Sequence, residues 1–243
     1  MHMLEVKNVS KYFGGLAALK NVSFTYDGGI LGIIGPNGAG KTTLFNVITG
    51  VYKPTSGKVF FEGKDITGLA PHKIRRLGIA RTFQIPRPFG RETVLENVVV
   101  AGLFGRVERV SREEVEKEAM ELLEFVGLKG KADLRASSLN IVQRKLLEIA
   151  RGLISRPKLL MLDEIVAGLT PAEVDRVVEL VKKINKEMGV NIIWIEHVMR
   201  AIMRSAEWII VLDFGEIISE GPPEKVAKDP KVIKAYLGEE YVA

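Results

Sequence analysis

Residues 30–43 read ILGIIGPNGAGKTT, and this stretch decides the fold. It begins with a continuous apolar run, which is typical of a β-strand buried on both faces of a parallel sheet. A glycine-rich turn follows, and residues 42–50, TTLFNVITG, continue with a helical pattern. A strand, a glycine-rich turn and a helix in this order predict a phosphate-binding loop at the start of the helix.

The turn fits the pattern G-x-x-x-x-G-K-[ST] through Gly35, Gly40, Lys41 and Thr42. Its glycines allow backbone N–H groups to curl around phosphate oxygens, and the helix N-terminus adds its positive dipole end. We expect Lys41 to reach the terminal phosphates of a nucleotide and the Thr42 hydroxyl to bind Mg²⁺. An ordinary glycine-rich turn would not need a lysine and a hydroxyl at these positions. The predicted nucleotide contacts of the loop are Gly35, Pro36, Asn37, Gly38, Ala39, Gly40, Lys41, Thr42 and Thr43.

Two further apolar runs have the same buried-strand character: KLLMLDE at 158–164 and NIIWIEH at 191–197. Between them, residues 170–188 carry apolar side chains at helical spacing. Thr170 and Glu173 form the sequence pattern of a capping box at the start of this helix. A strand, a helix and a strand in succession indicate a parallel sheet covered by helices.

The rest of the chain differs from this pattern. Alternating apolar and polar residues at 3–9, 23–27 and 58–66 predict antiparallel strands. Residues from about 86 to 153 have helical patterns only.

We therefore predict an α/β fold: a P-loop nucleoside triphosphatase core with a mainly parallel sheet, an N-terminal antiparallel β-subdomain and an inserted helical subdomain. A single domain should span residues 1–243. The core and β-subdomain should occupy 1–85 and 154–243, and the helical subdomain 86–153.

The composition sets limits on the class of protein. The chain has 243 residues, 47% of them hydrophobic, so it can bury a sizeable core. The absence of cysteine excludes disulfides and thiolate chemistry. A net charge of +5 arises from 35 basic and 30 acidic residues without a long block of one sign, which favours a mixed, solvated surface over a nucleic-acid footprint. Since there is no apolar run of about 18 residues and the N-terminus looks like a strand, we expect a soluble intracellular protein.

An acidic pair, Asp163 and Glu164, ends the predicted strand at 158–164. In parallel sheets, ligands bind at the carboxyl ends of the strands. We expect Asp163 to hold Mg²⁺ and Glu164 to polarise an attacking water. The alternative is that both residues simply end a strand in solvent.

Together these motifs resemble the ATP-binding subunit of an ABC transporter over essentially the whole chain. The resemblance implies ATP and Mg²⁺ as cofactors. It implies that Phe13 in KYFGG stacks on adenine, with Tyr12 as the alternative, and that Gln84 in RTFQIP contacts Mg²⁺ or the lytic water. It also implies that His197 in IWIEH is a switch histidine near the γ-phosphate, whereas His2 and His72 keep a structural interpretation.

The implied site residues fall into three groups. The resemblance assigns catalysis to Lys41, Gln84, Glu164 and His197, and Mg²⁺ binding to Thr42, Gln84 and Asp163. Phe13, Gln84, Asp163 and His197 join the loop in binding the nucleotide. The segment Ala167 to Thr170 corresponds to the family's loop that touches the opposite subunit.

The stretch ASSLNIVQRKLL at 136–147 lies where the family has its signature, L-S-G-G-Q, at a helix start. Leu139 and Gln143 match the signature, whereas Asn140, Ile141 and Val142 replace Ser-Gly-Gly. The resemblance implies that Leu139, Asn140 and Gln143 contact ATP held by the other subunit. Asn140 can still cap the helix, but the β-branched residues restrict the backbone where glycines would let it approach a phosphate.

A purely structural interpretation of this stretch remains open. It would be a helix start with these residues buried: Val142, Leu146, Ile149, Ala150 and Leu153.

Longer strings resemble the ATPases of branched-chain amino-acid importers: GIARTFQ at 78–84, TVLENV at 93–98, DEIVAGLTPAE at 163–173 and the stretch at 215–240. This implies an ATP-hydrolysing subunit at the cytoplasmic face of the membrane, peripherally attached, that drives import of branched-chain or other hydrophobic amino acids. Its partners would be transmembrane permeases, a second ATPase subunit and, indirectly, an extracytoplasmic solute-binding protein. The altered signature favours a heterodimer over a homodimer.

Two alternatives remain open. One is a soluble ABC-type ATPase that acts on nucleic acid or ribosomes, although we expect no nucleic-acid partner. The other is a nucleotide-gated subunit with little turnover.

Overall fold

A computed structural model describes residues 2–106, 108 and 110–237. The last three residues of the stretch 215–240 lie outside the described residues. The chain divides into two compact units, one formed by residues 1–74 with 191–243 and the other by residues 75–190. The predicted helical subdomain, 86–153, falls within the second unit. That unit is larger because it also includes the strands β6 and β7 and the helix α6.

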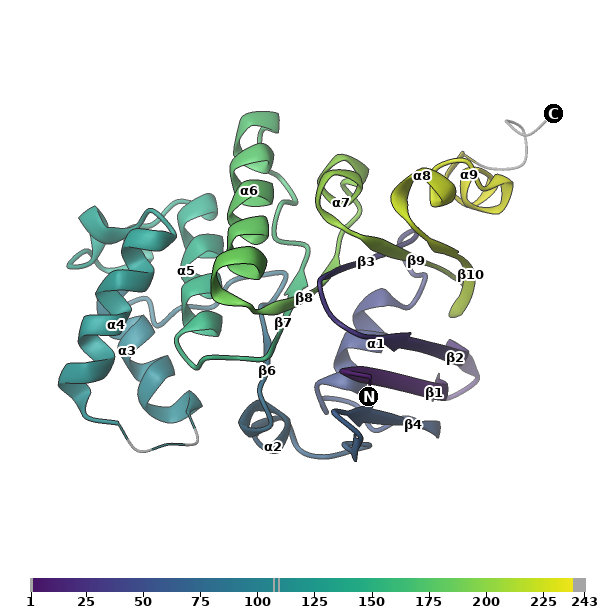
Figure 1. Ribbon diagram of the computed structural model, residues 1–243, viewed down its shortest axis with the longest axis horizontal. Helices are drawn as coiled ribbons and strands as arrows, with labels where there is room; N and C mark the ends of the chain where they lie inside the picture. Colours follow the sequence, from purple (N-terminus) through teal and green to yellow (C-terminus); the bar gives the residue numbers. More distant parts are fainter. Residues whose placement is uncertain (1, 107, 109, 238–243) are drawn as a thin grey trace. The chain divides into compact units, whose positions relative to one another are not determined.

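The first unit contains the predicted antiparallel strands as one sheet, and their order in it is β2-β1-β4-β5. Its strands are β1 (Leu4–Phe13), β2 (Leu16–Tyr26), β4 (Ser56–Phe61) and β5 (Lys64–Asp65). Along β1, Leu4 and Val6 are buried and Glu5 between them is not, because successive side chains of a strand point to opposite faces. Figure 1 shows β2, β1 and β4 side by side.

The same unit contains the strands on which the phosphate loop is built, in the order β10-β9-β3-β8. They are β3 (Ile30–Ile34), β8 (Asn191–Ile195), β9 (Trp208–Asp213) and β10 (Glu216–Gly221). β3 is buried throughout and runs parallel to both β8 and β9, which confirms the prediction from its apolar run. The helices of this unit are α1 (Lys41–Ile48), α7 (Met199–Ser205), α8 (Pro223–Val226) and α9 (Pro230–Leu237), while α2 (Pro71–Arg76) crosses the division.

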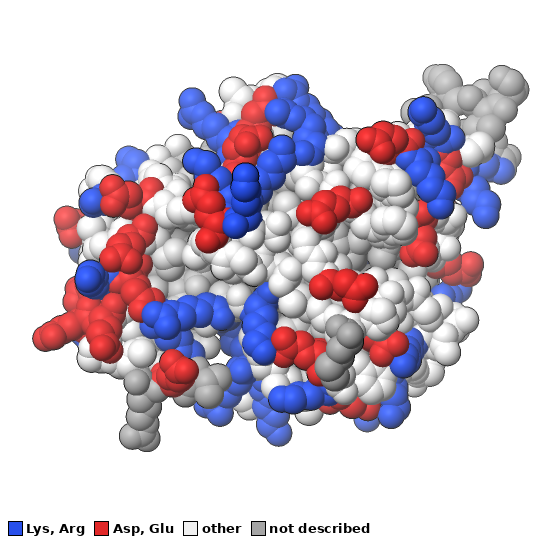
Figure 2. Space-filling view, viewed as in Figure 1, with Lys and Arg blue, Asp and Glu red and all other residues white. Residues whose placement is uncertain are grey.

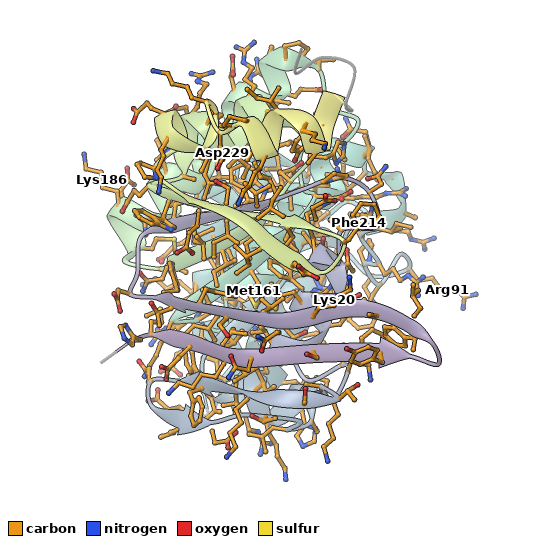
Figure 3. The ribbon with its side chains drawn as sticks, turned by 90° about the vertical axis from the view of Figure 1, so that its right-hand side faces the viewer. Lys20, Arg91, Met161, Lys186, Phe214 and Asp229 are labelled. Carbon is orange, nitrogen blue, oxygen red and sulfur yellow. The ribbon has the colours of Figure 1, made fainter. Side chains whose placement is uncertain are left out.

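The turn between β9 and β10 ties the antiparallel sheet to the phosphate loop. Gly215 accepts a hydrogen bond from the backbone N–H of Lys20 (2.8 Å) and donates its own N–H to the carbonyl of Ala39 (3.0 Å). Figure 3 shows Phe214 at this turn, close to Lys20 of β2. Gly215 therefore forms hydrogen bonds with both β2 and the phosphate loop.

The second unit combines a pair of parallel strands with the helices of the middle of the chain. The strands are β6 (Ile79–Arg81) and β7 (Leu159–Asp163), and the helices are α3 (Val94–Gly105), α4 (Arg112–Phe125), α5 (Ile141–Leu153) and α6 (Pro171–Met188), with short 3₁₀ segments η1 (Lys129–Lys131) and η2 (Ala136–Ser138). Figure 1 shows α3, α4 and α5 side by side. β6 was not predicted, because three residues are too few for a periodic signal.

Side chains cap the long helices of this unit. Thr93, Ser111, Asn140 and Thr170 each accept a hydrogen bond from the backbone N–H of the third helical residue of α3, α4, α5 and α6. The capping box of Thr170 and Glu173 is present as predicted. α6 buries its valine-rich face, although Met188 at its end is 39% exposed. Among the described residues, no helix is both long and apolar enough to cross a membrane.

Candidate functional site

The phosphate loop surrounds the Lys41 ammonium. The Lys41 residue is only 5% exposed, and its Nζ donates to the backbone carbonyls of Gly35 (2.6 Å) and Pro36 (2.9 Å). A buried ammonium needs acceptors to replace its hydration, and here the loop itself supplies them. The positive charge is thereby held within the ring of loop backbone that the sequence predicts as the phosphate cradle.

Two glycines of the loop are required by close backbone contacts. A Cβ atom on Gly35 would lie 2.0 Å from the carbonyl oxygen of Leu212, and one on Gly40 would lie 2.5 Å from that of Ala18. Gly40 also has a φ of +103°, a conformation that favours glycine. Gly38, with a φ of +81°, has open space where its Cβ would be. Gly35 and Gly40 therefore lie where the backbone is closely packed, whereas Gly38 lies beside open space.

The helix that follows the loop begins without a side-chain cap, unlike α3, α4, α5 and α6. The N-terminal N–H groups of a helix carry a partial positive charge and attract anions when no side chain satisfies them. Thr42 in the first turn is exposed, so its hydroxyl is accessible. These residues fit a phosphate group and an oxygen-liganded cation such as Mg²⁺. Of the other loop residues, Asn37 is exposed, Pro36 and Thr43 are half-buried and Ala39 is buried.

The predicted adenine-stacking residue lies at the end of β1. Phe13 is 42% exposed, and the neighbouring Tyr12 is 46% exposed. The Phe13 ring meets Tyr52 edge-on with ring centroids 5.2 Å apart, and the Lys11 ammonium lies 5.0 Å from its centroid. An aromatic ring that is exposed and fixed by neighbours suits a planar ligand.

The three histidines have different surroundings. His197 is exposed directly after β8, next to the fully buried Glu196, whose carboxylate accepts from Trp194 Nε1 (3.3 Å). His2 lies 2.6 Å from the Asp27 carboxylate, and His72 is exposed on α2. Of the three, His197 alone follows a buried parallel strand, as its predicted role requires.

In the second unit, Asp163 is the last residue of β7 and is 1% exposed. Its Oδ2 accepts a hydrogen bond from the Arg81 guanidinium at 2.7 Å, and its backbone N–H donates to the Thr82 hydroxyl at 3.1 Å. The side chain of Arg81 is itself only 9% exposed. A guanidinium held in this way fixes the orientation of the carboxylate. Sequence reasoning missed both Arg81 and Thr82, although they stand just before the predicted Gln84.

Glu164 follows at the end of the strand, and the structure brings it together with Gln84. The Gln84 Nε2 donates to the Glu164 Oε2 at 2.7 Å. The backbone of Glu164 has a φ of +48°, a left-handed conformation that costs free energy in a residue with a side chain. Strained residues of this kind cluster at functional sites, which agrees with the predicted role of Glu164.

The altered signature begins α5 with a complete capping box. Asn140 Oδ1 accepts from the Gln143 N–H (2.9 Å), and Gln143 Oε1 accepts from the Asn140 N–H (3.1 Å). Leu139 is 3% exposed, so its side chain packs within its own chain, whereas Ile141 is 51% exposed. Val142 and Leu146 are half-buried, not fully buried as the structural interpretation expects. The signature segment thus forms a capped helix start at which Asn140 and Ile141 are exposed and Leu139 is buried.

Comparison with known proteins identifies the family. The ABC transporter family profile matches residues 19–167, and a profile for branched-chain amino acid ATP-binding cassette transporters matches residues 216–242. The chain is 42% identical to a probable branched-chain amino acid transport ATP-binding protein, LivG, of Archaeoglobus fulgidus, over 98% of this chain and 96% of that protein. It is also 42% identical to the high-affinity branched-chain amino acid transport ATP-binding protein BraF of Pseudomonas aeruginosa, over 98% of both chains.

Solved structures agree with this result. An ATP-binding cassette of an ABC transporter in its ADP conformation matches with a TM-score of 0.89 and 37% identity, over 98% of this chain and 100% of that chain. A cassette seen as a dimer in a post-hydrolysis state with ADP and phosphate matches with a TM-score of 0.82 and 30% identity, over 91% of this chain and 99% of that chain.

These matches confirm the predicted fold class and the resemblance on which the predicted activity depends. They extend over nearly the full length of the chain, through the phosphate loop, the acidic pair and the C-terminal stretch. The chain belongs to the ATP-binding subunits of ABC transporters, which are ATPases that power solute transport, and within them to the branched-chain amino acid transport group.

Proposed function

We propose that this chain hydrolyses Mg²⁺-ATP to drive the import of branched-chain or other hydrophobic amino acids. The observation that carries the ATPase part is the Lys41 ammonium enclosed by the loop carbonyls at the uncapped start of α1. The amino-acid part rests on the names of the relatives. Neither relative suggests a nucleic-acid or ribosomal role, and Figure 2 shows basic and acidic side chains interspersed on the face drawn.

Binding of ATP is assigned to the phosphate loop and to Phe13. Backbone N–H groups of residues 37–43 would bind the phosphate oxygens, with Pro36 shaping the loop, and Lys41 would exchange its loop carbonyls for the terminal phosphates. The exposed Phe13 ring, with Tyr12 as the alternative, would stack on the adenine. Thr42, Gln84 and Asp163 are the proposed Mg²⁺ ligands. When bound, Mg²⁺ neutralises charge that develops on the transferred phosphoryl group.

Hydrolysis is assigned to the acidic residue after β7. Glu164 would act as the general base that polarises the attacking water, and Gln84, which contacts its carboxylate, would orient the same water. His197 would stabilise the γ-phosphate as charge develops on it. Asp163, held by Arg81, would remain fixed during the reaction. Two of the four proposed catalytic residues, Gln84 and Glu164, are in direct contact.

An exposed apolar face is assigned to the membrane partner. Phe83, Ile85, Phe89 and Phe104 are between 50% and 82% exposed, and three of them line a groove of about 340 Å³ beside α3. Exposed apolar patches of this kind mark protein interaction sites. We propose that a cytoplasmic segment of the permease occupies this groove, which would hold the chain at the cytoplasmic face of the membrane, with the solute-binding protein acting only through the permease.

A second ATPase subunit is proposed to complete the functional dimer. The signature carries β-branched Ile141 and Val142 where the family pattern has glycines, and the Ile141 side chain projects into solvent. Contact of Leu139, Asn140 and Gln143 with ATP on the opposite subunit would then have to use the backbone and the capped helix end. A heterodimer would pair this chain's phosphate loop with an unaltered signature, so we favour it over a homodimer.

Uptake of amino acids by reconstituted vesicles tests the proposed function. The chain would be co-expressed with candidate permeases, a candidate second ATPase and a candidate binding protein, and the complex inserted into proteoliposomes loaded with ATP and Mg²⁺. We expect uptake of radiolabelled leucine that is lost with Lys41→Ala. Leucine uptake that does not depend on internal ATP would refute the proposal. ATP turnover without uptake of any hydrophobic amino acid would refute its substrate.

The nucleotide-gated alternative makes a different prediction for the same vesicles. A gating subunit would support uptake when ATP is replaced by a non-hydrolysable analogue, whereas the proposed ATPase would not.

A further inference from the structure

Lys145 is a buried lysine on α5, two residues beyond the signature segment, and no role has been assigned to it above. The residue is 5% exposed and lies one helical turn before the buried Ile149. An ammonium on the apolar face of a helix costs free energy unless polar atoms replace its water. Its contacts therefore indicate what it is for.

Two of these contacts are with the loop that follows β7, which we define as residues 164–169. The Lys145 Nζ donates to the backbone carbonyl of Glu164 at 3.2 Å and to that of Ala167 at 2.7 Å. Within the loop, the Ala167 N–H donates to the Glu164 carbonyl at 3.4 Å, and the Leu169 N–H donates to the Val166 carbonyl at 3.2 Å. One side chain thus joins the beginning and the middle of the loop.

The backbone of Glu164, which Lys145 contacts, is also strained. Glu164 has a φ of +48°, and a residue with a side chain keeps such a conformation only when its surroundings enforce it. Two contacts enforce it from different sides, since Gln84 holds the carboxylate and Lys145 holds the carbonyl. Loss of the carbonyl contact would let the backbone relax and move the carboxylate away from its position.

We propose that Lys145 is a positioning residue that fixes the Glu164 carboxylate and couples the signature helix to the loop 164–169. The proposal deepens the proposed function and rests on it, because it takes Glu164 as the general base. It follows that a displacement of α5 would be transmitted to the Glu164 backbone through the Lys145 ammonium.

Three variants of the full chain test the proposal. Lys145→Met removes the donors but keeps an unbranched side chain of similar length, and Lys145→Arg keeps charge and donors. Arg106→Met is the matched control: the Arg106 side chain is 5% exposed in the same unit, but it contacts the Ile154 carbonyl and Glu118 instead of the loop. ATP turnover of the assembled transporter, equilibrium ATP binding, thermal unfolding and amide hydrogen exchange of peptides covering 160–170 would be measured for each.

We expect Lys145→Met to lower kcat by about tenfold or more, with ATP affinity within about twofold of the wild type. Hydrogen exchange should accelerate in residues 164–169, and Lys145→Arg should recover part of the rate. Arg106→Met should lower the unfolding temperature without changing kcat or exchange in the loop. If Lys145 had a purely structural role, kcat would instead fall in proportion to the unfolding temperature in all variants, including Arg106→Met.

The outcomes separate this proposal from the one on which it rests. An unchanged kcat and unchanged loop exchange in Lys145→Met overturn the role of Lys145. If Lys145→Met does not fold, Lys145→Leu, which also removes the donors, gives the same comparison, and an unchanged kcat there overturns the role equally. Glu164→Gln is the separate arm: if it retains normal turnover, the assignment of Glu164 as base fails, whatever the Lys145 variants do.

Discussion

At the scale of single residues, the acidic pair Asp163 and Glu164 is held by two different means. The Asp163 carboxylate is paired with a buried guanidinium, whereas the Glu164 carboxylate is held by a neutral amide from the exposed Gln84. A buried ion pair is costly to break, because it leaves one charge in a poorly solvated place. An exposed amide contact is easily exchanged for water. Asp163 is therefore built to stay in place, whereas a water can replace Gln84 at the Glu164 carboxylate.

Replacing Arg81 with Met tests this difference. The substitution should lower the free energy of unfolding by about 3–5 kcal/mol, because it removes one member of a buried ion pair. The exposed pair of Lys182 and Glu179 on α6 provides the control, since Lys182→Met should change stability by about 0.5 kcal/mol or less. Urea unfolding followed by circular dichroism measures both.

The double variant with Asp163→Asn completes the comparison. It should be less destabilised than the sum of the two single variants, because both charges are then gone. The interpretation is wrong if Arg81→Met costs no more than Lys182→Met.

At the scale of elements, the phosphate loop packs closely against β2 and the β9–β10 turn. Gly40→Ala would bring a Cβ within 2.5 Å of the Ala18 carbonyl, whereas Gly38→Ala would enter open space. Gly38→Ala should therefore cost about 1–2 kcal/mol, the price of a left-handed backbone alone. Gly40→Ala should cost clearly more, and thermal unfolding of the two variants compares them. Equal destabilisation would contradict the packing described for the loop.

The helices of the second unit are joined by a charge network centred on Glu118 of α4. Its carboxylate contacts Arg106, which follows α3, and Arg156, which follows α5. The hydrogen bond from Arg106 is the largest cause that holds the pKa of Glu118 below its ordinary value of 4.5, and the bond from Arg156 adds to it. A carboxylate with a lowered pKa stabilises the folded state above its unfolded pKa, and this contribution is lost as the pH falls through the folded pKa.

Glu118→Gln should accordingly lower the unfolding temperature at neutral pH but not at acidic pH. The gap between the variant and the wild type should be full above about pH 5 and close progressively as the pH falls below that value. Glu121→Gln, on the exposed face of the same helix, is the matched control and should follow the wild type at every pH. A gap for Glu118→Gln that does not depend on pH would exclude this charge network as its cause.

At the scale of the whole molecule, the altered signature predicts how the chain assembles. With Glu164→Gln to prevent turnover and with ATP present, the chain alone should remain a monomer by light scattering. Changing Ile141 and Val142 to Gly in that background should promote a homodimer, because glycines permit the close backbone approach that β-branched residues restrict. Changing both to Ala tests whether the loss of branching is sufficient. A tight homodimer of the chain with its own signature would contradict the proposed heterodimer.

Much of this molecule could be predicted from its sequence, for identifiable physical reasons. Strands buried on both faces of a parallel sheet have continuous apolar sequences, so β3, β7 and β8 were predicted within a residue or two of their bounds. The capping box of Thr170 and Glu173 and the glycine-rich turn at 35–43 depend on residues close together in the chain, and local patterns predicted both. β6 was missed because it is short.

The contacts that hold the site were missed because they are distant in sequence. Arg81 is separated from Asp163 by 82 residues, and Lys145 from Glu164 by 19. A lysine on the apolar face of α5 was the available signal for the second contact. The assignments of individual residues to ATP and Mg²⁺ remain predictions.

The central claim is that the phosphate loop binds ATP and that Glu164 hydrolyses it. Equilibrium ATP binding and single-turnover hydrolysis should be measured on the wild type, Lys41→Ala and Glu164→Gln. We predict that Lys41→Ala abolishes tight binding, whereas Glu164→Gln binds ATP like the wild type and leaves it intact. Unchanged affinity in Lys41→Ala, or normal hydrolysis in Glu164→Gln, would contradict the account.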